Sequence, residues 1–414
     1  MDSIKQERKL LRYTYLLCIV LFLNMYFIGK NEFDKKALIM GGIICFVFAA
    51  SHFIIRRFFP DGDKYILLFS NVLAVIGIGM LYRLDSPVAI KQLIFYAVGI
   101  AIFILVVVLF PSLSKFGKYK YVYMICTLIL MSLGSIMGAT TYGAKNWVKI
   151  AGFTFQPTEF GKLSLVAYLA ASLQYYGIKT EGKSEISKFK ALIEPGIVVM
   201  ISLGLMVVQT DLGSALLFFA ISITMLYIAT SNFKYILICL VLFMVGGFIS
   251  YQMFGHVRLR VTIWGDPWKY ATKDGYQLVQ SLISIASGGL FGTGLGLGHP
   301  GMVPVVTTDF IFAAVCEEMG LVTGFAILIL YFLLFYRCMR VPIYSKDNFT
   351  RLLAVGYSTM LAAQVLVIVG GVVGAIPLTG ITLPLVSSGG SSMLVTFFSL
   401  GILQKISEDG QNYE

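Results

Sequence analysis

The stretch "LIFYAVGIAIFILVVVLF", residues 93–110, decides the fold class of this chain. Its 18 residues carry no charge, and a helix rises about 1.5 Å per residue, so the run can cross most of a hydrocarbon core roughly 30 Å thick. Comparable runs recur along nearly all of the 414 residues, of which 58% are hydrophobic and 13% are charged. Because helices satisfy their own backbone hydrogen bonds in lipid, the sequence predicts an all-α polytopic membrane protein.

Twelve membrane-spanning helices can be drawn on this pattern. With the N-terminus placed in the cytoplasm, the inner loops hold 20 Lys and Arg residues and the outer loops hold 11, while Lys162 lies within a span. This bias predicts that both termini are cytoplasmic. The predicted spans are about 12–29, 37–55, 65–82, 92–111, 120–138, 158–176, 193–209, 211–229, 234–254, 310–336, 351–373 and 390–404.

Charge and cysteine usage exclude several classes of function. The net charge of +11 follows from topology and contact with anionic membrane lipids, and it does not indicate nucleic-acid binding. The six cysteines and three histidines show no metal-ligand spacing, so no protein metal site and no organic cofactor are predicted. The basic segment 1–12 leads into a long apolar run without a cleavage site, which favours a retained first helix over a signal peptide.

The outer loops 139–157, 255–309 and 374–389 are long and apolar. Within the second of them, residues 274–289 have a pattern typical of an amphipathic or re-entrant helix at the membrane surface, with a packed loop as the alternative. There is no convincing internal repeat, which disfavours an inverted-repeat transporter.

Ionisable residues in or beside spans are costly in lipid and indicate function. Glu159 and Lys162 are three residues apart on one helical face, as a structural ion pair or as catalytic groups. Asp211 begins a span and either caps that helix or serves a site. Glu317 and Glu318 point about 100° apart, which suits a buried strut better than a shared site.

Asp309 begins the span at 310–336 and follows two threonines. Thr307 or Thr308 could cap the helix alone, which would leave the carboxylate of Asp309 for general-base catalysis on a hydroxyl, with Lys162 as the nearby cation. A purely structural cap is the alternative.

Two further segments carry polar groups or glycines on the outer side. "GGLFGTGLGLGHPG", residues 288–301, lacks the strand and the βα context of a nucleotide-binding loop, so it is interpreted as a flexible loop that can approach a ligand. Residues 140–162 suit a pyrophosphate and a sugar ring through two lysines beside an amide and an indole, with Trp147 also explicable as a membrane anchor. The residues in question are Lys145, Asn146, Trp147, Lys149 and Gln156.

Five motifs in order resemble the SEDS family (shape, elongation, division and sporulation), which includes RodA, FtsW and SpoVE. The resemblance covers about residues 65–405, and the motifs are "GAKNWVKIAGFTFQPTEFGKLSL", "QTDLGSALLFF", "GYQLVQSLISIASGGLFGTGLG", "VPVVTTDFIFAAVCEEMGL" and "PLTGITLPLVSSGGSSML".

The resemblance implies a ten-helix body, here at 65–405, that polymerises lipid II into peptidoglycan strands at the outer face of the cytoplasmic membrane. The segment 1–64 adds two helices before it, and residues 406–414 form a short cytoplasmic tail. The implied partners are an undecaprenyl-linked glycan strand and a class B penicillin-binding protein, and a Mg²⁺ or Mn²⁺ ion could bridge the substrate pyrophosphate. The resemblance does not determine which cellular process the protein serves, whether elongation, division or sporulation.

The resemblance also assigns site residues. Asp309 matches the proposed general base, Glu159 and Lys162 match a paired charge site, and Trp147 matches a family tryptophan. The other predicted substrate-binding residues are Lys145, Asn146, Gln156, Asp211, Arg258, Arg260, Gln277, Gln280, Thr308, Ser387 and Ser391.

Three departures from the family pattern stand out, the first of which is the pair of additional helices before the ten-helix body. Ser388 replaces a tyrosine of the last motif, and an expected asparagine is missing around Gly370 and Gly371. The serine run 387–392 is predicted to cap the last span and to line the cavity that Asp309 faces. A lipid II flippase and a non-catalytic membrane scaffold are the alternative functions.

Overall fold

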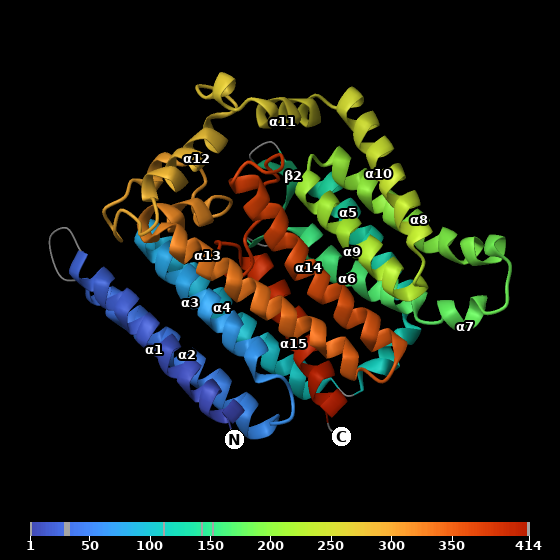
Figure 1. The fold of residues 1–414 in the computed structure, drawn as a ribbon, viewed down its shortest axis with the longest axis horizontal. Coiled ribbons are helices and arrows are strands. Elements are labelled where there is room, and N and C mark those ends of the chain that lie inside the picture. The colour runs from blue at the N-terminus through green and yellow to red at the C-terminus, as the bar shows by residue number, and fades with distance from the viewer. Residues whose placement is uncertain (1, 29–33, 111, 142–143, 151–152, 412–414) are drawn as a thin grey trace. The chain divides into compact units, whose positions relative to one another are not determined.

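The computed structural model describes residues 2–28, 34–110, 112–141, 144–150 and 153–411, and it is nearly all helical (Figure 1). Within those residues ten helices are long and apolar enough to cross a membrane. These are α1 (Asp2–Ile28), α2 (Lys35–Phe58), α3 (Lys64–Leu84), α4 (Ser86–Leu109), α5 (Lys120–Met137), α8 (Glu185–Val208), α9 (Leu212–Thr230), α10 (Phe233–Met253), α13 (Ile311–Arg340) and α14 (Asn348–Val372).

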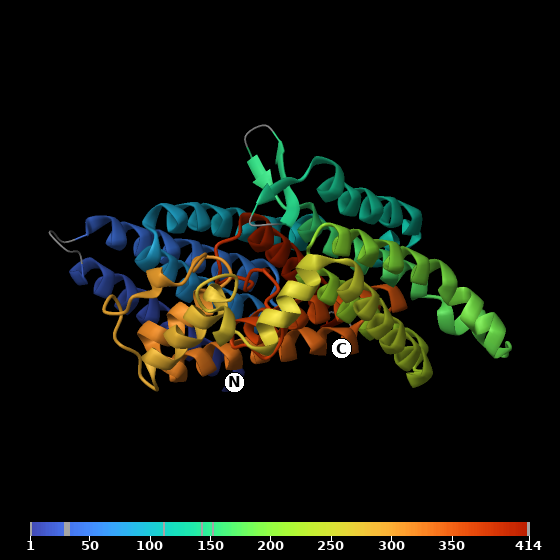
Figure 2. The same cartoon turned by 90° about the horizontal axis from the view of Figure 1, so that it is seen from above.

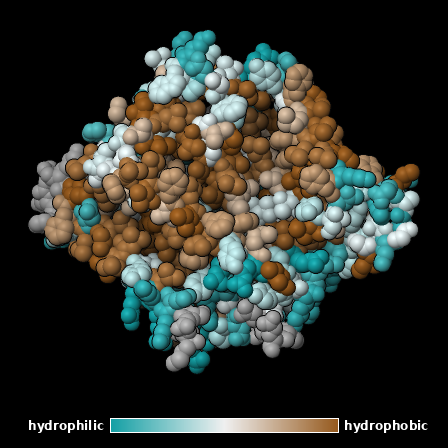
Figure 3. Space-filling view, viewed as in Figure 1, coloured by the Kyte–Doolittle hydropathy of each residue, from teal (hydrophilic) through white to brown (hydrophobic). Residues whose placement is uncertain are grey.

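The two remaining predicted spans are also helical. They correspond to α6 (Pro157–Leu173), which has 17 residues, and α15 (Gly390–Gln411), which is richer in polar residues. A helix therefore lies at every predicted span, while the number of twelve membrane crossings stays a prediction. Figure 3 shows hydrophobic side chains gathered over the middle of one face and hydrophilic ones toward its upper and lower ends.

The chain forms two compact units. The first comprises Met1–Leu109, Ala271–Arg337 and Thr382–Glu414, and the second comprises Phe110–Tyr270 and Cys338–Ile381. The shorter helices are η1 (Leu113–Lys118), α7 (Tyr176–Thr180), α11 (Gly255–Gly265), η2 (Trp268–Tyr270), α12 (Tyr276–Gly288), η3 (Pro300–Met302) and η4 (Val341–Tyr344).

The core of the first unit is α3, whose residues from Ile66 to Tyr82 are almost all buried. It contacts α1, α2, α4 and α15, and α4 packs along α15. The two additional helices α1 and α2 lie side by side (Figure 1). The start of α1 and the end of α15 lie at the same end of this unit, as an even number of spans requires, but the side of the membrane stays a prediction.

The second unit is built around α6 and α14, which contact each other and α9. The sequence supplies a start signal for each of these two helices. Pro157 stands at the first position of α6, where its missing N–H is not needed. Asp347 accepts a hydrogen bond from the Thr350 N–H at 2.9 Å and begins α14. The positions at which α6 and α14 begin determine where along each helix its polar residues lie.

A small antiparallel sheet corrects the prediction of an all-helical chain. Strands β1 (Ala139–Thr141), β2 (Ala144–Ile150) and β3 (Phe153–Phe155) pair in that order. Val148 lies opposite Phe155 and is buried, whereas Lys149 is exposed, which is the two-residue alternation of a strand. Figure 2 shows the sheet standing out from the helices α5 and α6 that it joins. The glycines and threonines here were interpreted as a loop because these strands are so short.

The predicted outer loop 255–309 contains two α-helices, besides the short 3-10 turns η2 and η3. One was predicted at 274–289 and is confirmed as the helix α12, with Leu278 and Val279 buried. The other, α11, was missed because Arg258 and Arg260 interrupt its apolar residues. Its position is fixed by side chains, since Trp264 Nε1 donates to the Gly374 carbonyl at 2.9 Å.

The glycine-rich segment after α12 is hydrogen-bonded to the backbone of α13. It is therefore an ordered segment, in contrast to the flexible loop that was predicted. Helix α13 is interrupted at Gly320, whose φ is 82° and ψ is 165°. Across this break the Leu321 N–H donates to Gly289 O at 3.0 Å and the Val322 N–H donates to Leu290 O at 3.1 Å. Glycine is required at positions 288, 292 and 320, because a Cβ atom there would lie within 2.4 Å of a backbone atom of the neighbouring segment.

We predict that Gly288→Ala destabilises the protein. A Cβ at Gly288 would lie 2.0 Å from the carbonyl oxygen of Cys316, and backbone cannot move away cheaply, so the loss should be about 1–3 kcal/mol. The measurement is the thermal unfolding midpoint in detergent. Gly301→Ala is the matched control, because a Cβ there meets nothing within 4 Å. Equal midpoints for the two variants would contradict this account of the packing.

Candidate active site

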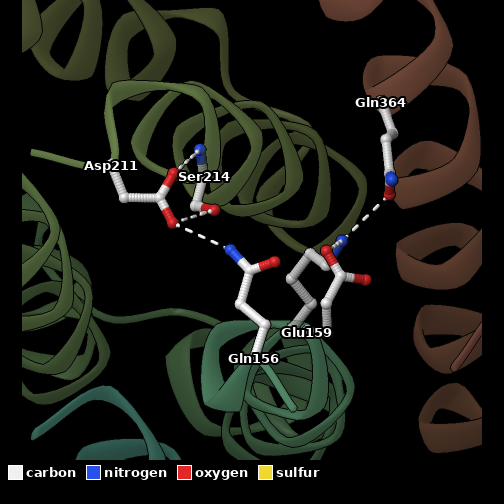
Figure 4. A network of polar contacts seen from close by, with 6 residues as sticks. Gln156, Glu159, Asp211, Ser214 and Gln364 are labelled. Atoms are coloured by element: carbon white, nitrogen blue, oxygen red, sulfur yellow. Dashed lines mark hydrogen bonds and ion pairs between the residues drawn. The ribbon is translucent and has the colours of Figure 1, made fainter. Parts of the chain in front are cut away.

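A buried ion pair occupies the start of α6. Lys162 Nζ lies 2.7 Å from Glu159 Oε1 and 2.9 Å from Gln364 Oε1 of α14. Figure 4 shows the side chain of Gln364 directed toward Glu159 at the start of α6. The relative exposures of Lys162, Glu159 and Gln364 are 1%, 5% and 2%. The predicted pairing of Glu159 with Lys162 is confirmed, and Gln364 is an addition that sequence reasoning missed.

The ion pair is close to neutral as a whole, which limits how far Lys162 can stabilise a negative charge on a substrate. Its ammonium group donates to a carboxylate and to an amide oxygen, so it has little charge left to offer a distant anion. Within the described residues, Glu159 Oε2 is buried without a hydrogen-bond partner. A buried carboxylate oxygen in that state can accept a hydrogen bond from a substrate hydroxyl or from water.

Asp211 caps a helix, which is one of its two predicted alternatives, while its role in a site stays a prediction. It caps α9 by accepting from the Ser214 N–H at 3.0 Å and from Ser214 Oγ at 2.8 Å. Its Oδ2 also accepts from Gln156 Nε2 at 3.3 Å (Figure 4). Two predicted site residues from different motifs, Gln156 and Asp211, are therefore adjacent in space.

Asp309 ends a tight turn that precedes α13. The Asp309 N–H and the Thr308 N–H both donate to Val305 O, at 3.2 and 3.1 Å, and Thr308 Oγ1 donates to the same oxygen at 3.1 Å. Thr308 is therefore occupied by its own turn. The side chain of Asp309 is neither fully buried nor fully exposed, so it can meet a substrate.

The serine motif lies against this turn. Ser387 Oγ donates to Thr308 O, and the Ser388 N–H donates to Thr307 O at 2.9 Å. The predicted proximity of this motif to Asp309 is thus supported by two contacts to the preceding residues. Ser387 itself is only 3% exposed, and its hydroxyl is engaged by backbone.

Glu317 and Glu318 hold the same segment, although they were expected to serve different neighbours. Glu317 Oε1 accepts from the His299 N–H at 2.7 Å, and its Oε2 accepts from Ser284 Oγ. Glu318 Oε2 accepts from the Gly296 N–H at 3.1 Å, and its Oε1 forms an ion pair with Arg83 at 3.0 Å. Because the segment wraps around the helix break, adjacent side chains can both reach it.

Two predicted arginines lie on α11. Arg260 donates to Leu378 O at 2.9 Å and to Thr379 O at 3.3 Å, so it holds backbone. Arg258 is exposed; it donates to Gln252 O at 3.0 Å and lies over the Tyr251 ring. Beside them, partial burial and then the charge of Arg260 lower the pKa of His256, which keeps this imidazole neutral at pH 7.

The other predicted residues are more scattered. Trp147 is partly exposed on β2, Gln277 and Gln280 are partly exposed on α12, and Ser391 is 9% exposed in the first turn of α15. The side chains of Lys145 and Asn146 lie outside the described part of the structure. Asp309 belongs to the first unit and Lys162 to the second, so their predicted proximity stays a prediction.

Sequence reasoning missed the buried glutamines. Gln92 and Gln364 are each 2% exposed and lie in apolar helices, yet within the interior of the spans only ionisable residues were considered as candidates. The signal that could have found them is the cost of an amide within a span, which requires a hydrogen-bond partner there.

We predict that Lys162→Met destabilises the protein by about 3–5 kcal/mol, because it leaves the buried Glu159 carboxylate without its cation. The double variant Glu159→Gln with Lys162→Met should recover much of the loss. Thermal unfolding in detergent measures both. Lys188→Met is the control, since Lys188 and Glu185 form an ion pair of the same sequence spacing at 2.8 Å but lie at the surface with side-chain exposures of 33% and 68%, and it should change the midpoint little. A double variant as unstable as Lys162→Met would overturn this interpretation.

Comparison with known proteins places the chain in a family. A family model described as cell cycle protein, for FtsW, RodA and SpoVE, matches residues 65–412. The peptidoglycan glycosyltransferase RodA of Mycobacterium tuberculosis is 39% identical over 87% of this chain and 81% of its own length. The stage V sporulation protein E of Bacillus subtilis is 31% identical over 83% of this chain and 96% of its own length.

Solved structures agree with the sequence comparisons. One describes the structural coordination of polymerization and crosslinking by a peptidoglycan synthase complex; its matching chain has a TM-score of 0.70 and 26% identity, over 84% of this chain and 98% of that one. The crystal structure of RodA from Thermus thermophilus has a TM-score of 0.63 and 25% identity, over 85% of this chain and 98% of that one. The chain is therefore a multi-pass membrane protein that belongs to the FtsW, RodA and SpoVE family.

Proposed function

We propose that this peptidoglycan glycosyltransferase polymerises lipid II into β1,4-linked glycan strands at the outer face of the cytoplasmic membrane. Relatives that are 37–39% identical are named peptidoglycan glycosyltransferase RodA. The observation that carries the proposal is Asp309, a partly exposed carboxylate at the start of α13 whose turn is held by hydrogen bonds to Val305 O. With both termini cytoplasmic and twelve spans, this turn faces outward.

In the proposed reaction Asp309 acts as general base. It takes the proton from the 4-hydroxyl of the GlcNAc of one lipid-linked disaccharide as that oxygen attacks C1 of the MurNAc at the end of the growing strand. The bond from C1 to the undecaprenyl pyrophosphate breaks, and that group leaves with the electron pair. One displacement converts the α-linked donor into a β linkage, so a single base is sufficient and no protein nucleophile is needed.

The departing pyrophosphate needs positive charge. Of the predicted cations, Arg260 binds Leu378 O and Thr379 O and Lys162 pairs with Glu159. Arg258 is the exposed one and is proposed for this role, while its proximity to Asp309, which belongs to the other unit, stays a prediction. Within the described residues no three His, Cys, Asp or Glu side chains form a metal-ligand group. A divalent cation would therefore enter with the substrate, bound by its pyrophosphate oxygens.

A class B penicillin-binding protein is the proposed partner. The support is that a structure similar to this chain comes from a peptidoglycan synthase complex in which polymerization and crosslinking are coordinated. Polymerisation by the purified protein should therefore be measured with and without that transpeptidase. Transbilayer movement of lipid II without polymer would instead support a flippase, and neither activity would support a scaffold.

We predict that Asp309→Asn lowers lipid II polymerisation at least about 100-fold, because the amide cannot accept the proton. The measurement is the length and yield of glycan product by gel electrophoresis, with the unfolding midpoint as a check on the fold. The control is Asp274→Asn. Asp274 is an exposed aspartate two residues before α12, and its substitution should leave the activity unchanged. Full polymerisation by Asp309→Asn would refute the assignment of the base.

A further inference from the structure

Gln92 is a buried amide in the most apolar part of the chain. It lies in the second turn of α4 and is 2% exposed. Its Nε2 donates to Ser387 O at 3.0 Å, and its Oε1 accepts from the Gly389 N–H at 3.1 Å. Both ends of one side chain thus bind the backbone of the serine motif on either side of Ser388. A buried amide that lost these partners would cost a few kcal/mol.

The segment that Gln92 binds has a strained backbone. Leu385 has a φ of 68°, a conformation that costs roughly 1–3 kcal/mol for a residue with a Cβ. The segment is packed closely against two helices. A Cβ at Gly77 of α3 would lie 2.5 Å from Val386 Cα, and a Cβ at Gly390 would lie 2.5 Å from the Phe95 ring of α4. Such a conformation persists only where the surroundings hold it, and Gln92 supplies two of the contacts.

The same segment holds the turn before Asp309. Ser387 Oγ accepts from the Leu383 N–H at 3.0 Å and donates to Thr308 O, while the Ser388 N–H donates to Thr307 O at 2.9 Å. That turn is strained as well, since Val305 has a φ of 49°. A continuous series of hydrogen bonds therefore runs from Gln92 through the serine motif to the residue that precedes Asp309.

We propose that Gln92 is a positioning residue for Asp309 and acts through Ser387. The inference rests on the proposed role of Asp309 as general base. The physical reason is that a displacement of about 1 Å in a catalytic group can cost 100-fold in rate, and the strained turn before Asp309 is hydrogen-bonded to the segment that Gln92 holds. Gln92 itself touches backbone and need not touch substrate.

The test uses the full-length protein with its transpeptidase partner and measures kcat and KM for lipid II per folded enzyme. Gln92→Met removes both hydrogen bonds at similar volume, and it should lower kcat at least about 10-fold while KM stays within about twofold. Gln92→Glu keeps the acceptor for Gly389, and its protonated form can also donate to Ser387 O. Its kcat relative to the wild type should therefore rise as the pH is lowered, which a purely structural role would not produce.

The matched control is Gln174→Met. Gln174 is also a buried glutamine that donates to backbone, at 2.8 Å to Gly117 O and 3.0 Å to Ala171 O, but it lies at the end of α6, where its partners are η1 and its own helix. It should lower the unfolding midpoint and leave kcat unchanged. If Gln92→Met behaves in the same way, the positioning role is wrong.

A double variant tests the connection through Ser387. Ser387→Ala and Gln92→Met should each lower kcat, and together they should lower it little further, because they break one series of contacts. Fully multiplicative effects would overturn the connection. Asp309→Asn separates the two hypotheses: an active Asp309→Asn refutes the proposed base, whereas an inactive Asp309→Asn beside a fully active Gln92→Met refutes only the role of Gln92.

Discussion

The constraint on which this structure depends is the lack of water in a hydrocarbon core, where each backbone or side-chain polar group must find a partner inside the protein. Regular helices meet this requirement through their own backbone hydrogen bonds. The turn at 305–309 and the segment at 382–389 cannot, because their backbones are irregular. Gln92 and Ser387 supply the missing partners, and two segments far apart in sequence are thereby held together.

The same constraint explains how charge is distributed. Lys162 is almost completely buried, and it lies between a carboxylate and an amide oxygen. Glu317 and Glu318 accept hydrogen bonds from backbone N–H groups that a glycine-rich segment exposes. A carboxylate with such partners is part of the framework. Asp309 differs from them in exposure, because its side chain remains partly exposed, which its proposed role as general base requires.

Hydropathy was sufficient to predict the long helices, and helical geometry was sufficient to predict that Lys162 pairs with Glu159. Both depend on residues close in sequence. Hydropathy could not show which distant backbone a polar side chain meets, so Gln92 and Gln364 were overlooked and the glycine-rich segment was taken for a flexible loop. The strands at 139–155 were missed for a related reason: a strand of three residues has too short a pattern to recognise, and its stability comes from its neighbour.

The break in α13 at Gly320 has a consequence for chain length. Residues 289 and 290 pair with residues 321 and 322, and the N–H groups of Thr293 and Gly294 donate to the carbonyls of Glu317 and Glu318. These contacts give an irregular segment a fixed register, like that of two paired strands. An inserted residue between Gly289 and Gly296 would shift every later partner by one position. This stretch should therefore tolerate no insertion or deletion, and its backbone amides should exchange with solvent as slowly as those of a helix.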